Sequence, residues 1–152
     1  MTKTSKNAQV PQCVKTDVSC SVTKKELRIG NWMFVDNMIV NHIISQIRET
    51  MVNVDYIRID TNEPHCSLIA IDRLRGIELN SNCLSNLGFK KRQWLNDWFV
   101  NIPNSKTILI YKDGKAYICA ENQHPILYIK CKYAHTIQNI YYSLTGRDLT
   151  DR

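Results

Sequence analysis

The chain has 152 residues, a length typical of a single domain that buries its own hydrophobic core. Hydrophobic residues make up 43% of it and charged residues 22%, a composition that excludes the fibrous and fully disordered classes. The formal net charge is +6, and half of this excess lies in residues 1–26, where five lysines are opposed only by Asp17 and Glu26.

The N-terminal segment, residues 1–24, is rich in Thr, Ser, Lys, Asn and Gln and lacks helical or strand periodicity. We therefore expect a flexible tail over 1–24, followed by a single α+β domain over 25–152. The N-terminus lacks the apolar stretch of a secretory signal, and every apolar run is far shorter than the about 20 residues of a membrane-spanning helix. These features predict a cytoplasmic protein with no membrane partner, whose six cysteines are free thiols.

Antiparallel strands are expected over the first half of the domain. Strand-like runs at 27–35 and 38–48 flank the turn-forming pair Asp36-Asn37, and this arrangement predicts a hairpin. Alternating apolar residues predict further strands at about 53–60 and 68–71.

A short helix and an ambiguous segment follow. The polar cluster 80–82 can accept hydrogen bonds from the first amides of a helix, and Gly88 suits the end of that helix. The next segment contains Trp94, Trp98 and Phe99 and ends at Pro103, and its pattern favours neither a strand nor a short helix.

The last third of the chain has the clearest pattern. The runs TILIY and KAYIC are joined through Asp113-Gly114, the best short signal for a hairpin, and ILYIKC adds a third strand. A closing helix is predicted to end at Gly146, with an inner face formed by Tyr133, Ile137, Ile140, Tyr141 and Leu144. The expected fold is α+β: a small antiparallel β-barrel-like or meander sheet, one short helix, and a C-terminal helix packed on the sheet.

Four residues of the last third of the chain have the chemistry of a zinc site. Cys119, His124, Cys131 and His135 lie close together in the sequence and supply two thiolates and two imidazoles. Their spacing lacks the tight pair of ligands that zinc knuckles use, and the alternative is a core Cys pair with two exposed histidines. No metal site is predicted, and metal binding by these four residues stays an open alternative.

Catalytic motifs give no support for an enzyme. The sequence has no Gly-x-Ser-x-Gly elbow, no phosphate-binding glycine loop and no spacing that places two carboxylates on one helix face. We therefore favour a non-catalytic protein with no cofactor, and an active site assembled from distant residues remains the alternative.

One local pattern indicates nucleic-acid binding. Lys90, Lys91 and Arg92 could contact phosphates, while Trp94 in the same segment could stack on an unpaired base. The alternative is a solvated charge run beside core tryptophans. Residues 27–152 hold 15 basic against 12 acidic residues, and this near balance argues against nucleic acid as the main ligand.

Three stretches carry a resemblance: LRIGN at 27–31, GIELNSNCLSNLGFKK at 76–91 and KYAHTIQNIYYSLTGRDL at 132–149. They resemble small uncharacterised proteins encoded by phages and mobile elements of gut anaerobes. The resemblance implies a β-barrel-like segment opened by the first motif, a short helix before Gly-Phe, and a closing helix that ends in Leu-Thr-Gly. It also implies a bacterial host cell, and it supplies no activity for any residue. The long Cys-bearing tail departs from the pattern of this group.

These observations lead to two expected functions. The first is a non-catalytic binding or accessory protein of a phage or mobile element, whose partner is a host or phage protein. Its recognition surface would be the polar side of the closing helix, whose members are His135, Gln138, Asn139 and Tyr142. The alternative role of His135 and Gln138 is to hydrogen-bond a neighbouring loop. The second function is nucleic-acid binding through the basic tail and residues 90–98.

Overall fold

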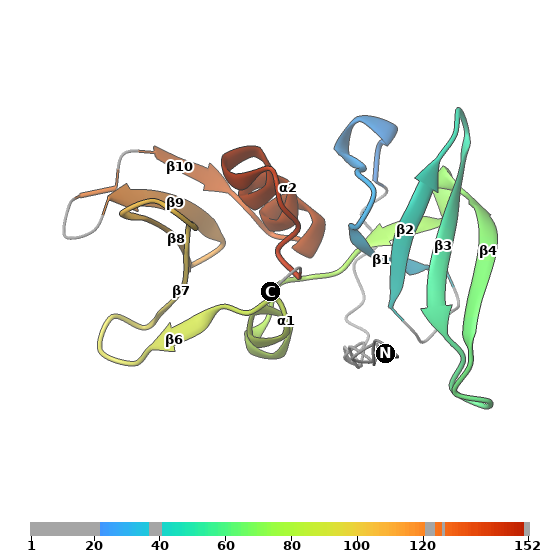
Figure 1. Cartoon of the computed structure of the whole chain (residues 1–152), viewed down its shortest axis with the longest axis horizontal. Helices are drawn as coiled ribbons and strands as arrows, with labels where there is room; N and C mark the ends of the chain where they lie inside the picture. The colour runs from blue at the N-terminus through green and yellow to red at the C-terminus, as the bar shows by residue number, and fades with distance from the viewer. Residues whose placement is uncertain (1–21, 37–40, 121–123, 126, 151–152) are drawn as a thin grey trace, which may run out of the picture.

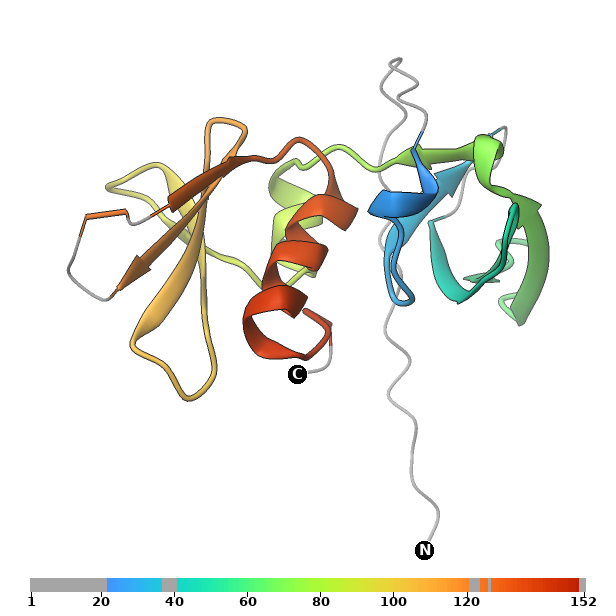
Figure 2. The same ribbon diagram turned by 90° about the horizontal axis from the view of Figure 1, so that it is seen from above.

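The computed structural model describes residues 22–36, 41–120, 124–125 and 127–150. They form two five-stranded sheets with a helix, α2 (Ala134–Thr145), lying between them (Figures 1 and 2). Every strand pairing is antiparallel, which confirms the α+β class. Within the described part of the chain neither sheet closes into a barrel, and the expected single sheet is instead two. The predicted tail lies almost wholly outside the described residues.

The first sheet has the strand order β4-β3-β2-β1-β5. It confirms the predicted hairpin, whose residues 37–40 lie outside the described ranges, because each of the first four strands pairs with the next. The two strands after it are also present, but the second begins at Pro64, four residues before the predicted start. A 3-10 turn, η2 (Ile71–Arg73), then returns the chain so that the fifth strand pairs with the first. The strands are β1 (Trp32–Val35), β2 (His42–Ile47), β3 (Met51–Ile57), β4 (Pro64–Ala70) and β5 (Leu74–Gly76).

The second sheet is a simple meander in which each strand pairs with its neighbour in sequence. Its β8–β9 turn confirms the predicted hairpin, since Asp113 and Gly114 both have positive φ, at 49° and 73°. The ambiguous segment around Trp98 is a strand. The charge run at 90–92 also forms a short strand, which the sequence pattern did not predict. The strands are β6 (Lys90–Arg92), β7 (Asp97–Asn101), β8 (Thr107–Lys112), β9 (Lys115–Ala120) and β10 (Leu127–Lys130).

Both predicted helices are present, with the expected ends. In α1 (Ser81–Asn86) the Asn80 Oδ1 accepts a hydrogen bond from the Cys83 amide at 2.9 Å, so Asn80 caps the first turn. In α2 (Ala134–Thr145) the chain leaves the helix at Gly146 with a φ of 67°. A 3-10 turn, η1 (Lys24–Glu26), precedes the first sheet. Neither α-helix in the described ranges is long and apolar enough to span a bilayer.

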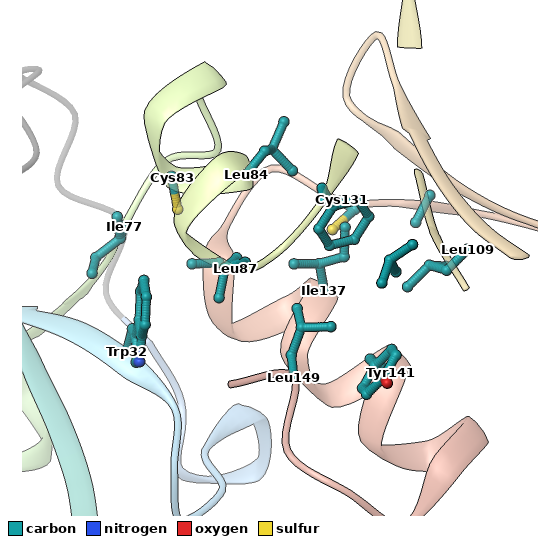
Figure 3. Close-up of a cluster of buried hydrophobic side chains, with 14 of the residues drawn as sticks. Trp32, Ile77, Cys83, Leu84, Leu87, Leu109, Cys131, Ile137, Tyr141 and Leu149 are labelled. Atoms are coloured by element: carbon teal, nitrogen blue, oxygen red, sulfur yellow. The ribbon is translucent and has the colours of Figure 1, made fainter. Parts of the chain in front are cut away.

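Each sheet buries its own hydrophobic cluster. One is formed mainly by side chains of the first sheet and includes Met33, Ile44 and Val54. The other lies between the second sheet and the two helices. Trp32 is the link, because it belongs to β1 but packs in the cluster of the second sheet. Figure 3 shows its ring next to Ile77 in that cluster.

Charge is divided between the two sheets. Residues 27–80 contain five basic residues, all arginines, against seven acidic ones. Residues 81–152 contain ten basic against five acidic ones. The near balance of the whole folded part therefore hides a basic half that contains the second sheet.

Candidate nucleic-acid interface

The two faces of the second sheet differ in what covers them. Val100, Leu109 and Ala116 point to the inner face and are buried under the helices. Side chains alternate between the two faces along a strand, so the residues directly before and after each of these three point to the opposite face. We call this the outer face. In Figures 1 and 2 α2 lies on one side of this sheet only.

A row of mainly aromatic residues crosses the outer face. Its members are direct partners on successive strands, one from each of the five strands, and neither hydrophobic cluster includes any of them. Tyr128 is 59% exposed, and its ring centroid lies 6.1 Å from that of Tyr117. From β6 to β10 the row is Lys90, Phe99, Ile110, Tyr117 and Tyr128.

A basic row runs beside the aromatic one. On each strand, the residue two positions from the member of the aromatic row also points to the outer face, about 6.8 Å along the strand. All five of these residues are charged. From β6 to β10 this second row is Arg92, Asp97, Lys112, Lys115 and Lys130.

Two cations of the outer face lie over its rings. The Lys115 Nζ is 5.2 Å from the centre of the Tyr128 ring, and the Arg92 guanidinium is 5.3 Å from the Phe99 ring. A cation over an aromatic face is electrostatically favourable, so the two rows form one continuous surface.

Only part of this positive charge is available to a ligand. The Arg92 guanidinium donates two hydrogen bonds to Asp97, at 2.8 and 2.7 Å, and this pairing raises the pKa of Arg92. The Lys112 Nζ donates to the Leu95 carbonyl at 3.0 Å. Three lysines of the outer face form no ion pair with another described residue, and they are Lys90, Lys115 and Lys130.

The structure does not bring the four residues predicted for nucleic-acid binding onto one face. Lys90 and Arg92 lie on the outer face, whereas Lys91 lies on the inner face, with its Nζ 5.9 Å from the centre of the Trp98 ring. Trp94 is 99% exposed in the turn between β6 and β7. The sequence analysis did not identify Phe99, Tyr117 or Tyr128 as binding residues. The signal that could have found them is the alternation of side chains along each strand, which places each of them on the outer face.

The polar side of α2, predicted as a recognition surface, faces the first sheet. Gln138 is 1% exposed: its Oε1 accepts from the Trp32 amide at 2.9 Å, and its Nε2 donates to the Gly30 carbonyl at 3.2 Å. His135 is also buried, so neither of the two lies on the surface. For Gln138 the alternative role, hydrogen bonding to a neighbouring loop, is the one in the structure.

Asn139 and Tyr142 belong to the same seam. The Asn139 Oδ1 accepts from the Asn31 Nδ2 at 2.9 Å and its Nδ2 donates to the Glu26 carbonyl at 2.8 Å. Tyr142 is 40% exposed, and the Arg28 guanidinium lies 4.1 Å from its ring centre. The predicted inner face also needs a correction, because Leu144 is 39% exposed.

A hollow of about 320 Å³ lies between η1, α2 and the β9–β10 edge. Its aliphatic walls come from Ile118 and Ile129 of the sheet and from Ile140 and Leu144 of the helix, and the polar residues that line it include Glu26, His135 and Asn139. Burial lowers the pKa of His135, and the nearby Glu26 carboxylate partly offsets this effect. The hollow can accept an apolar side chain.

The possible zinc ligands lie apart. Cys119 is on the outer face of β9, while Cys131 is in the inner cluster, where burial raises its pKa to about 12. His135 is in the seam, and His124 is exposed. Among the described residues, which include all four, no group of three or more His, Cys, Asp or Glu could hold a metal ion.

Comparisons with known proteins identify no family. No family model, no curated protein and no solved structure matches the chain. The class that the structure defines is therefore an α+β protein of two antiparallel sheets, with a basic and aromatic face on the second.

Proposed function

We propose that the chain is a non-catalytic nucleic-acid-binding protein and that its ligand lies on the outer face of the second sheet. The observation that carries this proposal is the row from Lys90 to Tyr128, flanked by Lys115 and Lys130. Lysines supply contacts to phosphates, and rings supply stacking surfaces for bases. The excess of basic residues in 81–152 supports nucleic-acid binding over protein binding, for which a surface with balanced charge would suffice.

Salt dependence tests the proposal. Three available lysines predict that the logarithm of the binding constant falls with the logarithm of salt concentration with a slope of about −2 to −3, since each phosphate contact contributes about −0.7 to −0.9. Fluorescence anisotropy with labelled oligonucleotides measures this slope. In Lys115→Ala/Lys130→Ala the slope should shrink by about two.

The matched control removes two cations from the first sheet. Arg48→Ala/Arg58→Ala changes the net charge by the same amount, and the exposed Arg58 forms an ion pair with Asp60. It should leave the slope unchanged. An equal loss in both double variants, or no salt-dependent binding at all, would overturn the proposal.

Protein binding is the second candidate, and a different observation favours it. β10 is the edge strand of its sheet, and Leu127, Tyr128 and Ile129 on it are 53%, 59% and 38% exposed. Edge strands of this kind bind extended segments of partner proteins. The resemblance to phage and mobile-element proteins makes an accessory role in a bacterial host cell part of this candidate.

Affinity capture from a bacterial lysate, treated with nuclease, separates the two candidates. A protein partner should remain after digestion and at moderate salt, and Leu127→Lys/Ile129→Lys should release it. If digestion abolishes every association, the protein-binding candidate is wrong.

A further inference from the structure

We infer that the nucleic acid bound by the outer face is single-stranded, with its bases over the aromatic row and its phosphates over the lysines beside it. This inference rests on the proposed function and adds the class of ligand.

The shape of the face favours a single strand over a duplex. Duplex readers insert a helix or a β-ribbon into a groove, and both described α-helices pack on the inner side of this sheet. The outer face carries neither described α-helix. Its β7 and β9 strands include the buried Asp97 and Cys119, and its most exposed ring is Tyr128 on the edge strand β10. Rings on an open surface can stack only on bases that are unpaired and turned outward.

The spacing of the two rows fits a chain that crosses the strands. Neighbouring strands lie about 4.8 Å apart, so the span from Phe99 on β7 to Tyr128 on β10 is about 14 Å. The basic row runs parallel to it, at about 6.8 Å along the strands. A nucleic-acid strand laid across the sheet would therefore meet stacking positions on one side and Lys115 and Lys130 on the other.

Two features mark Tyr128 as the main stacking position. Its ring is 59% exposed, and the two described groups recorded against it are the Lys115 ammonium, 5.2 Å from the ring centre, and the tilted Tyr117 ring, 6.1 Å away. A base can therefore stack on this ring while Lys115 turns to a phosphate. Trp94, 99% exposed in the turn after β6, offers a second ring at the opposite edge of the sheet.

The experiment compares three labelled probes: a twelve-nucleotide thymidine oligomer, the corresponding uridine oligomer and a twelve-base-pair duplex. Anisotropy at about 0.1 M salt should show at least tenfold tighter binding of the single strands, because stacking adds to the phosphate contacts. The thymidine and uridine arms distinguish DNA from RNA as the preferred strand.

Variants at Tyr128 test the stacking. Tyr128→Ala should weaken single-strand binding by on the order of 10-fold, with the salt slope unchanged, because no cation is lost. Tyr128→Phe keeps the ring and should bind as the original protein does. Tyr142→Ala is the matched control, since it removes an exposed tyrosine from α2, away from the outer face.

The outcomes separate the inference from the function on which it rests. If the duplex binds as tightly as the single strands, or if Tyr128→Ala binds normally while Lys115→Ala/Lys130→Ala does not, the single-strand inference is wrong and nucleic-acid binding stands. If none of the three probes binds, both are wrong.

Discussion

The side-chain amide of Gln138 joins α2 to the backbone of the first sheet by two hydrogen bonds, one from the Trp32 amide and one to the Gly30 carbonyl. The Trp32 amide has no solvent as a substitute partner, because Gln138 is 1% exposed and Trp32 is 7% exposed, whereas the Gly30 carbonyl is only partly buried. This one residue therefore couples the two sheets.

We predict that Gln138→Ala lowers the free energy of unfolding by about 1–3 kcal/mol, because it leaves the buried Trp32 amide unpaired and removes the bond to the partly buried Gly30 carbonyl. Urea unfolding followed by tryptophan fluorescence measures the loss. Ser143→Ala is the control on the exposed side of α2 and should stay within about 0.5 kcal/mol of the original protein. Equal stability of Gln138→Ala and the original chain would show that the seam does not depend on this residue.

Stability should fall as the pH falls below neutral, in part through His135. Burial lowers its pKa in the folded protein below the ordinary value of 6.5, so the unfolded chain binds a proton first. The unfolded state is then favoured as the pH drops through 6.5, with a slope of up to about 1.4 kcal/mol per pH unit from this group. Unfolding free energies measured between pH 8 and 5 should show a shallower decline in His135→Asn. Parallel curves for the two proteins would contradict the assignment.

Two glycines should resist substitution for different reasons. At Gly76 an added Cβ would lie 2.8 Å from the Tyr133 ring, and overpacking of this kind costs about 1–3 kcal/mol. At Gly114 nothing lies within 4 Å, but the φ of 73° costs an alanine about 1–2 kcal/mol. In a Tyr133→Ala background the cost of Gly76→Ala should shrink, whereas that of Gly114→Ala should not. Unfolding measurements on the double-mutant cycles decide this.

The described cysteines should differ in reactivity. Cys66 is exposed, whereas Cys131 is 1% exposed with its pKa raised to about 12 by burial, so iodoacetamide should modify Cys66 in the folded protein and Cys131 only after unfolding. Hydrogen bonding to Asp55 raises the pKa of Cys66. Asp55→Asn should therefore increase the rate of Cys66 alkylation, as measured by peptide mass spectrometry, and an unchanged rate would argue against that hydrogen bond.

Local chemistry made several elements predictable from the sequence. The Asp113-Gly114 turn, the Asn80 cap and the Gly146 helix end each depend on a few neighbouring residues, and all three are present. β6 was not predictable in this way. Its residues, 90–92, have no apolar alternation and form a strand because they pair with β7.

The positions of the site residues were not predictable from the sequence, because they depend on contacts between distant parts of the chain. By periodicity Gln138 belongs to the polar side of α2, and only the packing of that side against β1 explains its burial. The aromatic row depends on the register of five strands, and Tyr128 falls in the same row as Phe99 only through the pairings of β8 and β9. A single sequence does not contain this register in a readable form.

The uneven distribution of charge makes the folded part an electric dipole. Residues 27–80, with their acidic excess, form one end, and residues 81–152, with twice as many basic as acidic residues, form the other. A polyanion attracts one end and repels the other, which turns the molecule during its approach. For the proposed nucleic-acid ligand, this orientation would bring the second sheet into contact first. This orientation weakens as salt shortens the Debye length to about 8 Å at physiological ionic strength, well below the size of the molecule.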